Sequence, residues 1–359
     1  MTIEFAGNQE IVQEARKHLD QPAWDFLVGG SESETALRRN RLAFDRLGFR
    51  PRVLVDVRNV DPSTTFLGHK LRIPVVLAPV GSLQRFAPEG AVAAAKAADQ
   101  FGIGQVVSSA TLPQLEDTAK TGKHLKVFQL YIRDDWPWVE DMVHRMKKAG
   151  YTALCLTVDT ARASRRERPI LGRSSLALVS GPGAGREYGA AMTWESMGRL
   201  KKMAGLPFML KGIATAEDAK LAVEHGVDVI WVSNHGGRQL DHSLGTMDTL
   251  PEIVEAVDGK ADIMLDGGVN RGTDVLKAIA LGVKAVAIGR MQGYGLAAAG
   301  PAGLVRVLEI MEDEIVSAMG LLGVTRVDQI TSAYVRRTDP VLMPHEMSAW
   351  VNIPEGRIQ

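Results

Sequence analysis

Polar and charged residues that could carry chemistry recur through the middle and C-terminal parts of the 359-residue sequence, each at the end of a short apolar run. They supply imidazole, carboxylate, ammonium, guanidinium and phenol groups, the usual agents of proton transfer and anion binding. A single Ser, Thr or Asn among them is better explained as a capping or turn residue. The joint pattern, in contrast, indicates one shared site. The set comprises Ser108, Ser109, Gln129, Tyr131, Thr157, Asp159, Lys211, Ser233, Asn234, His235, Arg238, Asp266 and Arg290.

His235 is the candidate general base, because imidazole exchanges protons near neutral pH. Asp159 could orient the ring and stabilise the imidazolium, and Arg166 with Arg238 could clamp a carboxylate. A base beside a carboxylate clamp indicates an organic acid as substrate. The alternatives are a turn role for His235 and a solvated charge run at 165–168.

Two glycine-containing segments predict a phosphate site. Gly267 and Gly268 follow one apolar run, and Gly289 with Arg290 follows the next. In barrels of parallel strands, the last two loops hold phosphate on backbone amides, and an arginine adds bidentate charge. A phosphorylated ligand or cofactor is therefore expected.

The apolar runs that precede these residues predict eight strands with amphipathic helices between them, for example at 89–101, 215–226 and 272–281. Eight βα repeats indicate an α/β fold, a (β/α)8 TIM barrel, whose active site lies at the carboxyl ends of the strands. The predicted strands are 73–80, 105–109, 126–131, 153–159, 207–212, 228–234, 262–268 and 284–290.

Residues 1–65 are predicted to be a helical N-terminal extension, with helices at 10–19, 24–29 and 35–44, that plugs the barrel bottom or covers a mouth. The extension and barrel together are expected to form a single domain over 1–359. Periodicity fails over 160–192, where Gly181, Pro182, Gly183 and Gly185 cluster, so we expect a long loop that acts as a lid or a mobile segment.

Composition argues for a small-molecule partner. Lys plus Arg (42) equals Asp plus Glu (42), so we expect no nucleic acid and no anionic membrane as partner. Cys155 is the single cysteine, which excludes a disulfide framework and a multi-cysteine metal site. The N-terminus has no signal-peptide pattern and no apolar run reaches membrane-span length, so we expect a cytoplasmic protein without a bound metal.

The segment SNHGGRQLD (Ser233 to Asp241) resembles the active-site signature of the FMN-dependent 2-hydroxy acid oxidase and dehydrogenase family, which includes glycolate oxidase, lactate oxidase, mandelate dehydrogenase and the flavin domain of flavocytochrome b2. LRRNRLAF, FRPR, FQLY, LTVDT, LKG and DGGV recur in order, so the resemblance extends from about Trp24 to Gly320. It implies oxidation of an (S)-2-hydroxy acid to the 2-oxo acid, with flavin as hydride acceptor. Dioxygen or another acceptor would reoxidise the flavin, and the resemblance suggests a homotetramer.

The resemblance also implies roles for individual residues. His235 would take the substrate proton, Asp159 would orient it, and Tyr131 would hydrogen-bond the substrate oxygen. Arg238 and Arg166 would bind the substrate carboxylate. Lys211 would stabilise the negative charge of reduced flavin, since developing anions need preorganised donors.

The same resemblance assigns a set of residues to FMN, from the ring through the ribityl chain to the phosphate. Asp266 would bind the ribityl hydroxyls, and the glycines with Arg290 would hold the phosphate. The full set is Pro79, Val80, Gly81, Ser108, Gln129, Thr157, Lys211, Ser233, Asp266, Gly267, Gly268, Asn270, Gly289 and Arg290.

Three positions depart from the family pattern. Phe26 stands at a substrate-binding position where many members have tyrosine, which favours a larger or aromatic substrate side chain. Asn270 replaces an arginine that normally meets the phosphate, and Arg271 is an open candidate to compensate, so weaker retention of FMN is expected. Gly81 stands where glycolate oxidase has alanine, which leaves the electron acceptor undecided.

Three other functions remain as alternatives. The first is an FMN barrel that acts on a different substrate, such as a modified peptide or nucleotide, and the SNHGGRQ segment argues against it. The second is a catalytically silent barrel that binds FMN or a phosphorylated metabolite. The third is a metal hydrolase built on His235 and His242, but the sequence around them lacks clustered ligands.

Overall fold

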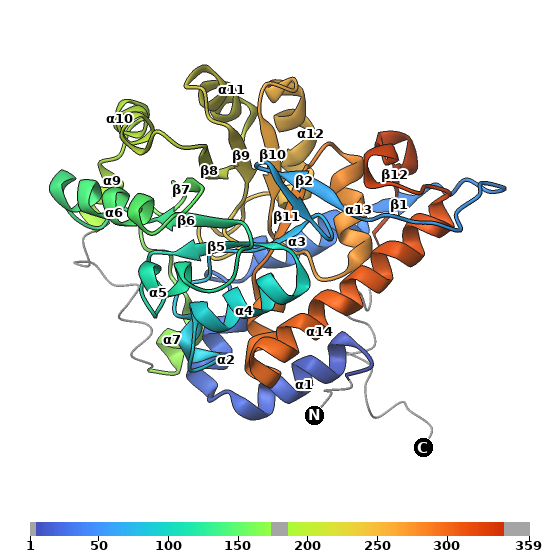
Figure 1. Ribbon diagram of the computed structural model, residues 1–359, viewed down its shortest axis with the longest axis horizontal. Helices are drawn as coiled ribbons and strands as arrows, with labels where there is room; N and C mark the ends of the chain where they lie inside the picture. Colours follow the sequence, from blue (N-terminus) through green and yellow to red (C-terminus); the bar gives the residue numbers. More distant parts are fainter. Residues whose placement is uncertain (1–4, 174–185, 341–359) are drawn as a thin grey trace.

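Eight parallel strands form a closed barrel at the centre of the molecule (Figure 1). The computed structural model describes residues 5–173 and 186–340. Each strand pairs with the next along the chain, and the last closes the ring against the first. This arrangement confirms the predicted (β/α)8 barrel. The strands are β4 (Val75–Leu77), β5 (Gly104–Ser108), β6 (Lys126–Leu130), β7 (Ala153–Thr157), β8 (Phe208–Ile213), β9 (Val229–Val232), β10 (Asp262–Leu265) and β11 (Ala285–Ile288).

Most strands end before the predicted boundary at their carboxyl ends. The strand predicted at 228–234 ends at Val232, and the strand predicted at 262–268 ends at Leu265. Beyond these points the backbone takes positive φ, 58° at His235 and 96° at Gly267, which a strand cannot accommodate. The residues with candidate chemistry therefore lie in loops that the strand ends hold in place.

Helices surround the barrel, and those predicted at 89–101, 215–226 and 272–281 are confirmed with ends shifted by one or two residues. Side-chain caps fix several starts, such as Asp135 on the amide of Trp138 and Thr215 on the amide of Asp218. The surrounding helices are α4 (Ala91–Phe101), α5 (Leu115–Ala119), α6 (Trp136–Lys148), α10 (Trp194–Ala204), α11 (Ala216–Glu224), α12 (Thr246–Val257), α13 (Gly272–Ala280) and α14 (Arg290–Leu322).

Two apolar cores hold these layers together. The larger core lies between strands and helices, where residues such as Leu154 and Leu250 are fully buried. The smaller core fills the barrel interior with Val106, Met209 and Trp231. Because both faces of each strand are buried, the strands are apolar along their length, as the sequence indicated.

The N-terminal extension contains the three predicted helices, α1 (Asn8–His18), α2 (Gln21–Val28) and α3 (Thr35–Asp45). The prediction of an all-helical extension is wrong at two places. Strand β1 (Leu47–Phe49) pairs with β12 (Val335–Arg337), and β2 (Thr64–Phe66) forms a hairpin with β3 (His69–Leu71). The hairpin follows from a β-branched run before a Leu67-Gly68 turn, a signal that the helical periodicity upstream obscured.

The extension serves both ends of the barrel. Phe66 and Leu71 of the hairpin join the interior core at the amino-terminal ends of the strands, so they plug the bottom. Residues of α2 and α3 instead line the cavity at the other end. Helix α1 lies along α14, and Figure 1 shows the two side by side.

The loop after β7 is less irregular than predicted. It contains the short helices α7 (Glu167–Leu171) and α9 (Arg186–Ala190), while the glycine cluster at 181–185 lies outside the described residues. The described residues also contain three short 3-10 helices, η1 (Leu83–Arg85), η2 (Val327–Gln329) and η3 (Ser332–Tyr334). Within the described ranges, no helix has both the length and the apolar character needed to cross a bilayer.

Candidate active site

A cavity of about 1190 Å³ opens at the carboxyl ends of the strands. Six predicted residues do not line it, although two of them, Asp159 and Ser233, contact residues that do; the six are Ser108, Ser109, Gln129, Asp159, Ser233 and Asn234. The other predicted residues line its wall together. They are Phe26, Pro79, Val80, Gly81, Tyr131, Thr157, Arg166, Lys211, His235, Arg238, Asp266, Gly267, Gly268, Asn270, Gly289 and Arg290.

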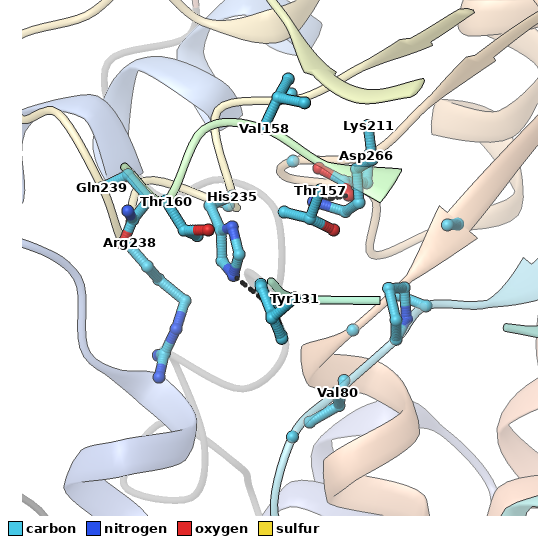
Figure 2. Close-up of a pocket in the computed structure, with 18 of the residues that line it drawn as sticks. Val80, Tyr131, Thr157, Val158, Thr160, Lys211, His235, Arg238, Gln239 and Asp266 are labelled. Atoms are coloured by element: carbon cyan, nitrogen blue, oxygen red, sulfur yellow. Dashed lines mark hydrogen bonds and ion pairs between the residues drawn. The ribbon is translucent and has the colours of Figure 1, made fainter. Parts of the chain in front are cut away.

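His235 is held between Asp159 and Tyr131. Its Nδ1 lies 3.0 Å and 3.2 Å from the two carboxylate oxygens of Asp159, and its Nε2 lies 3.4 Å from the Tyr131 hydroxyl (Figure 2). When the Nδ1–H donates to Asp159, Nε2 is left with a lone pair toward the cavity. The ring is thus oriented to accept a proton from a group bound beside Tyr131.

The backbone beneath this pair depends on glycine. Residue Gly212 sits in a bulge of β8, where the register shifts between Lys211 and Ile213. Its φ is +114°, and an added Cβ would lie 2.8 Å from the Cβ of Asp159. The bulge therefore gives Asp159 the room it needs to reach His235.

Burial and charge set the proton positions in the pair. Burial lowers the pKa of His235; Asp159 opposes this effect, and Lys211 reinforces it. Burial by itself would raise the pKa of Asp159, but His235 and Lys211 outweigh it and the pKa lies below its usual value. Near neutral pH the arrangement is a neutral imidazole on an ionised carboxylate, as a general base requires.

Lys211 lies in a second buried network on the opposite side of the site. Its Nζ donates to Ser233 Oγ at 2.8 Å and lies 3.2 Å from Asp266, and Ser233 donates to Asp266 at 2.6 Å. Burial disfavours the ammonium, but Asp266 and Asp159 together raise the pKa of Lys211 above its usual value. The site therefore holds a fixed positive charge beneath the cavity, with Thr157 close by (Figure 2).

Two arginines, Arg238 and Arg290, line the part of the cavity wall next to Gly29. Arg238 donates to the Gly29 carbonyl at 2.7 Å and lies 4.9 Å from the Phe26 ring centroid. Arg290 donates to the carbonyls of Gly29 and Gly236, both at 3.0 Å. Burial, together with the neighbouring Arg166 and Arg290, lowers the pKa of Arg238 well below its usual range. Buried cations held by neutral carbonyls favour an anionic ligand.

The residues present fit a bound flavin mononucleotide. Both amide atoms of Gln129 and the hydroxyl of Thr157 are buried and have no hydrogen-bond partner among the described residues. Buried polar atoms of this kind call for a ligand with a polar edge. Gly268 has φ +89°, and an added Cβ would lie 3.0 Å from the Asn40 backbone, so this loop needs glycine where it packs against α3.

The departures from the family pattern are visible in the cavity. Phe26 packs toward Phe86, with ring centroids 6.2 Å apart, and presents no hydroxyl to Arg238. Arg271 pairs with Glu314 and does not line the cavity, so it does not replace the arginine missing at Asn270.

Sequence reasoning missed three residues that help to hold the site together, Asn40, Gln239 and Asp241. Asn40 and Asn234 exchange side-chain amide hydrogen bonds at 2.8 Å, which ties α3 to the loop after β9. Gln239 donates to the Asp159 carbonyl at 2.8 Å, and Asp241 accepts from the Ala36 amide. Asn40 lies in LRRNRLAF, and Gln239 and Asp241 lie in SNHGGRQLD, so the motifs themselves were the available signal.

The metal-hydrolase alternative finds no support here. The described residues contain no group of three or more His, Cys, Asp or Glu side chains placed to hold a metal ion. His242 is largely exposed and lies 3.9 Å from Asp241 rather than beside His235.

Comparison with known proteins gives a consistent result. The family model described as FMN-dependent dehydrogenase matches residues 15–181 and 183–337. The L-lactate oxidase of Nostoc sp. is 40% identical over 352 residues, which cover 91% of this chain and 96% of that protein. The glycolate oxidase of Spinacia oleracea is 38% identical over 354 residues, with 93% and 96% covered. A crystal structure of mandelate oxidase has a TM-score of 0.88 and 36% identity, with 94% of this chain and 100% of that chain covered.

Proposed function

The chain belongs to the family of FMN-dependent dehydrogenases and oxidises 2-hydroxy acids with FMN as cofactor. We propose how its own residues catalyse this reaction. Bound FMN supplies the two-electron acceptor. The observation that carries the proposal is the His235–Asp159 pair, which lies beside Tyr131 in a cavity with buried arginines.

His235 accepts the hydroxyl proton of an (S)-2-hydroxy acid at Nε2. Asp159 stabilises the imidazolium that forms, because its carboxylate already faces Nδ1 at 3.0 Å. Burial raises the pKa of Tyr131, so its phenol stays protonated and donates to the substrate oxygen. With FMN bound, Lys211 would provide the positive charge that stabilises the reduced cofactor.

The substrate carboxylate binds to Arg238 and Arg166. Arg238 reaches the cavity from the loop after β9, and Arg166 from the loop after β7, where it lies 3.5 Å from Gln239. Two guanidinium groups from different loops fix both the charge and the orientation of a carboxylate. The hydroxyl is then directed toward His235.

The substrate side chain is larger than that of glycolate, and we propose an aromatic or bulky aliphatic group. Phe26 and Phe86 present an apolar surface next to Arg238, and Ile132 and Met192 also line the cavity. An apolar side chain that displaces water from these groups gains roughly 25 cal/mol per Å² buried. A small polar acid gains none of this.

The test is an anaerobic absorbance titration of FMN-loaded protein with glycolate, lactate and (S)-mandelate. We expect mandelate to bleach the flavin band at the lowest concentration. The matched variant Phe26→Tyr restores a hydroxyl near Arg238 and should shift the preference toward glycolate. Failure of every 2-hydroxy acid to reduce the bound flavin would contradict the function, and equal use of all three would contradict the size preference.

The assembly and location of the protein are also proposed. We propose that residues 1–359 act as one FMN-binding domain in a cytoplasmic homotetramer, and that dioxygen or another acceptor reoxidises the flavin. The exposed apolar side chains include Val53 (81% exposed), Leu54 (103%) and Leu321 (74%). The first two lie on the segment after β1, which projects from the body of the molecule (Figure 1). Exposed apolar side chains of this kind favour contact with a second copy. Light scattering measures the mass of the particle in solution and so tests the homotetramer. Rapid return of the flavin absorbance when air is admitted to the reduced enzyme would identify an oxidase.

A further inference from the structure

We propose that Arg38 of α3 supplies the second positive charge for the FMN phosphate, in place of the side chain that position 270 does not provide. The inference rests on the cofactor and extends the function above to a residue outside the barrel strands and their loops. It follows from a comparison of the cations around the phosphate end of the cavity.

The phosphate end has one cation from the strand loops. Gly267, Gly268 and Asn270 follow β10, and Gly289 with Arg290 follows β11. A phosphate monoester carries nearly two negative charges at neutral pH, since its second pKa is about 6. Among the described residues of these two loops, Arg290 is the cation that lines the cavity, so a further positive charge must come from elsewhere.

Two neighbouring cations are already committed. Arg41 lines the cavity, but its guanidinium pairs with Asp274 at 2.7 Å and with Asp45 at 3.2 Å. Arg271 pairs with Glu314 and lies outside the cavity wall. The charge of each is balanced by a carboxylate, and neither is available to balance a phosphate.

Arg38 differs from both. It lines the same cavity as Gly268 and Asn270, and it is exposed. Within the part of the chain that the structure describes, its guanidinium makes one long contact, 3.5 Å to Thr35 Oγ1, and no carboxylate lies within ion-pair distance. Its positive charge is therefore available to pair with an anionic ligand.

The helix that carries Arg38 is fixed against the phosphate loops. Arg41, one turn further along the same face, donates to the Gly268 carbonyl at 2.7 Å. Asn40 bonds Asn234, and the Cβ position of Gly268 lies 3.0 Å from the Asn40 backbone. The backbone of Arg38 is thus held close to the loops, while its long side chain is free to turn toward the anion.

The experiment compares FMN with riboflavin, which has the same ring and ribityl chain but no phosphate. Stripped protein is titrated with each, and quenching of flavin fluorescence gives the two dissociation constants. We expect Arg38→Ala to weaken FMN binding by about 10- to 100-fold, the loss of one charge-assisted contact, and to leave riboflavin binding unchanged. Arg38→Gln should behave in the same way.

Two further variants complete the design. Arg39→Ala removes the same charge one residue along α3, where the side chain holds the carbonyls of His242 and Ser243 and does not line the cavity. It should leave the ratio of riboflavin to FMN dissociation constants as in wild type. Adding Asn270→Arg to Arg38→Ala should recover most of the lost FMN affinity.

The proposal is overturned if Arg38→Ala leaves FMN binding unchanged, or if it weakens FMN and riboflavin equally. A ratio that falls as far in Arg39→Ala as in Arg38→Ala also overturns it, because charge alone would then explain the loss. These titrations contain no hydroxy acid, so their result is independent of whether the proposed substrate reduces the flavin.

Discussion

The two ends of the barrel both bury ionisable groups, but they do so in different ways. At the carboxyl end, Gln129 and Thr157 have buried polar atoms without partners among the described residues, and the half-buried Arg238 and Arg290 donate to neutral carbonyls. At the amino end, the hairpin plugs the interior with Phe66. The barrel is thus closed by its own side chains at the amino end, whereas the polar groups at the carboxyl end require a ligand to satisfy their hydrogen bonds and charges.

Charged groups at the amino end are satisfied locally. Lys126 at the start of β6 donates to the Gly122 carbonyl at 2.9 Å, and Asp99 accepts from the His124 amide at 3.1 Å. His124 itself is the exception, since its Nδ1 is buried without a hydrogen bond from a described residue. Burial alone therefore does not mark a functional site in this fold. The functional end is marked by a cavity whose wall carries both an unpartnered buried hydroxyl, that of Thr157, and guanidinium groups that donate to neutral carbonyls.

The largest effect on activity is expected from removing the general base at the carboxyl end of the barrel. His235→Ala should lower the rate of flavin reduction by about 10²- to 10⁴-fold, because general base catalysis is lost. FMN should still bind, since the side chain is not at the phosphate loops. Anaerobic stopped-flow measurement of flavin bleaching gives the rate, and fluorescence titration gives the affinity.

A matched change at the amino end provides the control. His124→Gln replaces a buried histidine of the plugged end and should leave the reduction rate close to wild type. A His235→Ala variant that reduces flavin at a near-normal rate would remove His235 from the proposed role.

The second prediction concerns the plug. Phe66→Ala should lower the free energy of unfolding by about 3–5 kcal/mol, because Phe66 is 1% exposed and its removal leaves a cavity in the barrel interior. Flavin reduction in the folded fraction should stay close to wild type, since the cavity for the cofactor is at the other end. Urea titration with FMN present measures the stability. An equal loss in stability and in reduction rate would show that the two ends are not independent.

The different physical character of the two ends also explains what could be predicted from the sequence. All eight strands were found because buried parallel strands are apolar along their length. Residues such as His235 and Arg238 were found because strand ends in this fold point at one site. Their individual roles stay predictions.

What could not be predicted depends on contacts between distant segments. The β2–β3 hairpin was missed because its strands are three residues each and its fit to the barrel interior is tertiary. Asn40 joins a loop 194 residues away, and no local pattern announces that pairing. Arg38 becomes a candidate only when the structure places it on the wall of the same cavity as Asn270.

The smallest effect tests the exception at the plugged end. Burial, with a contribution from Lys126, lowers the pKa of His124 from 6.5 to about 4, although Asp99 opposes this. The folded state therefore binds fewer protons than the unfolded state between these values, and the stability that neutral His124 contributes above pH 6.5 is lost as the pH falls toward 4. The full difference corresponds to about 3 kcal/mol.

Urea titrations with FMN at pH 7 and pH 5 measure how far the free energy of unfolding falls between these two values. The contribution of His124 to this fall is about 2 kcal/mol, and the variant His124→Gln should lack it. His235, whose pKa is also lowered, should retain its share of the acid dependence in that variant. An unchanged slope in His124→Gln would show that titration of His124 does not contribute to the acid dependence of stability.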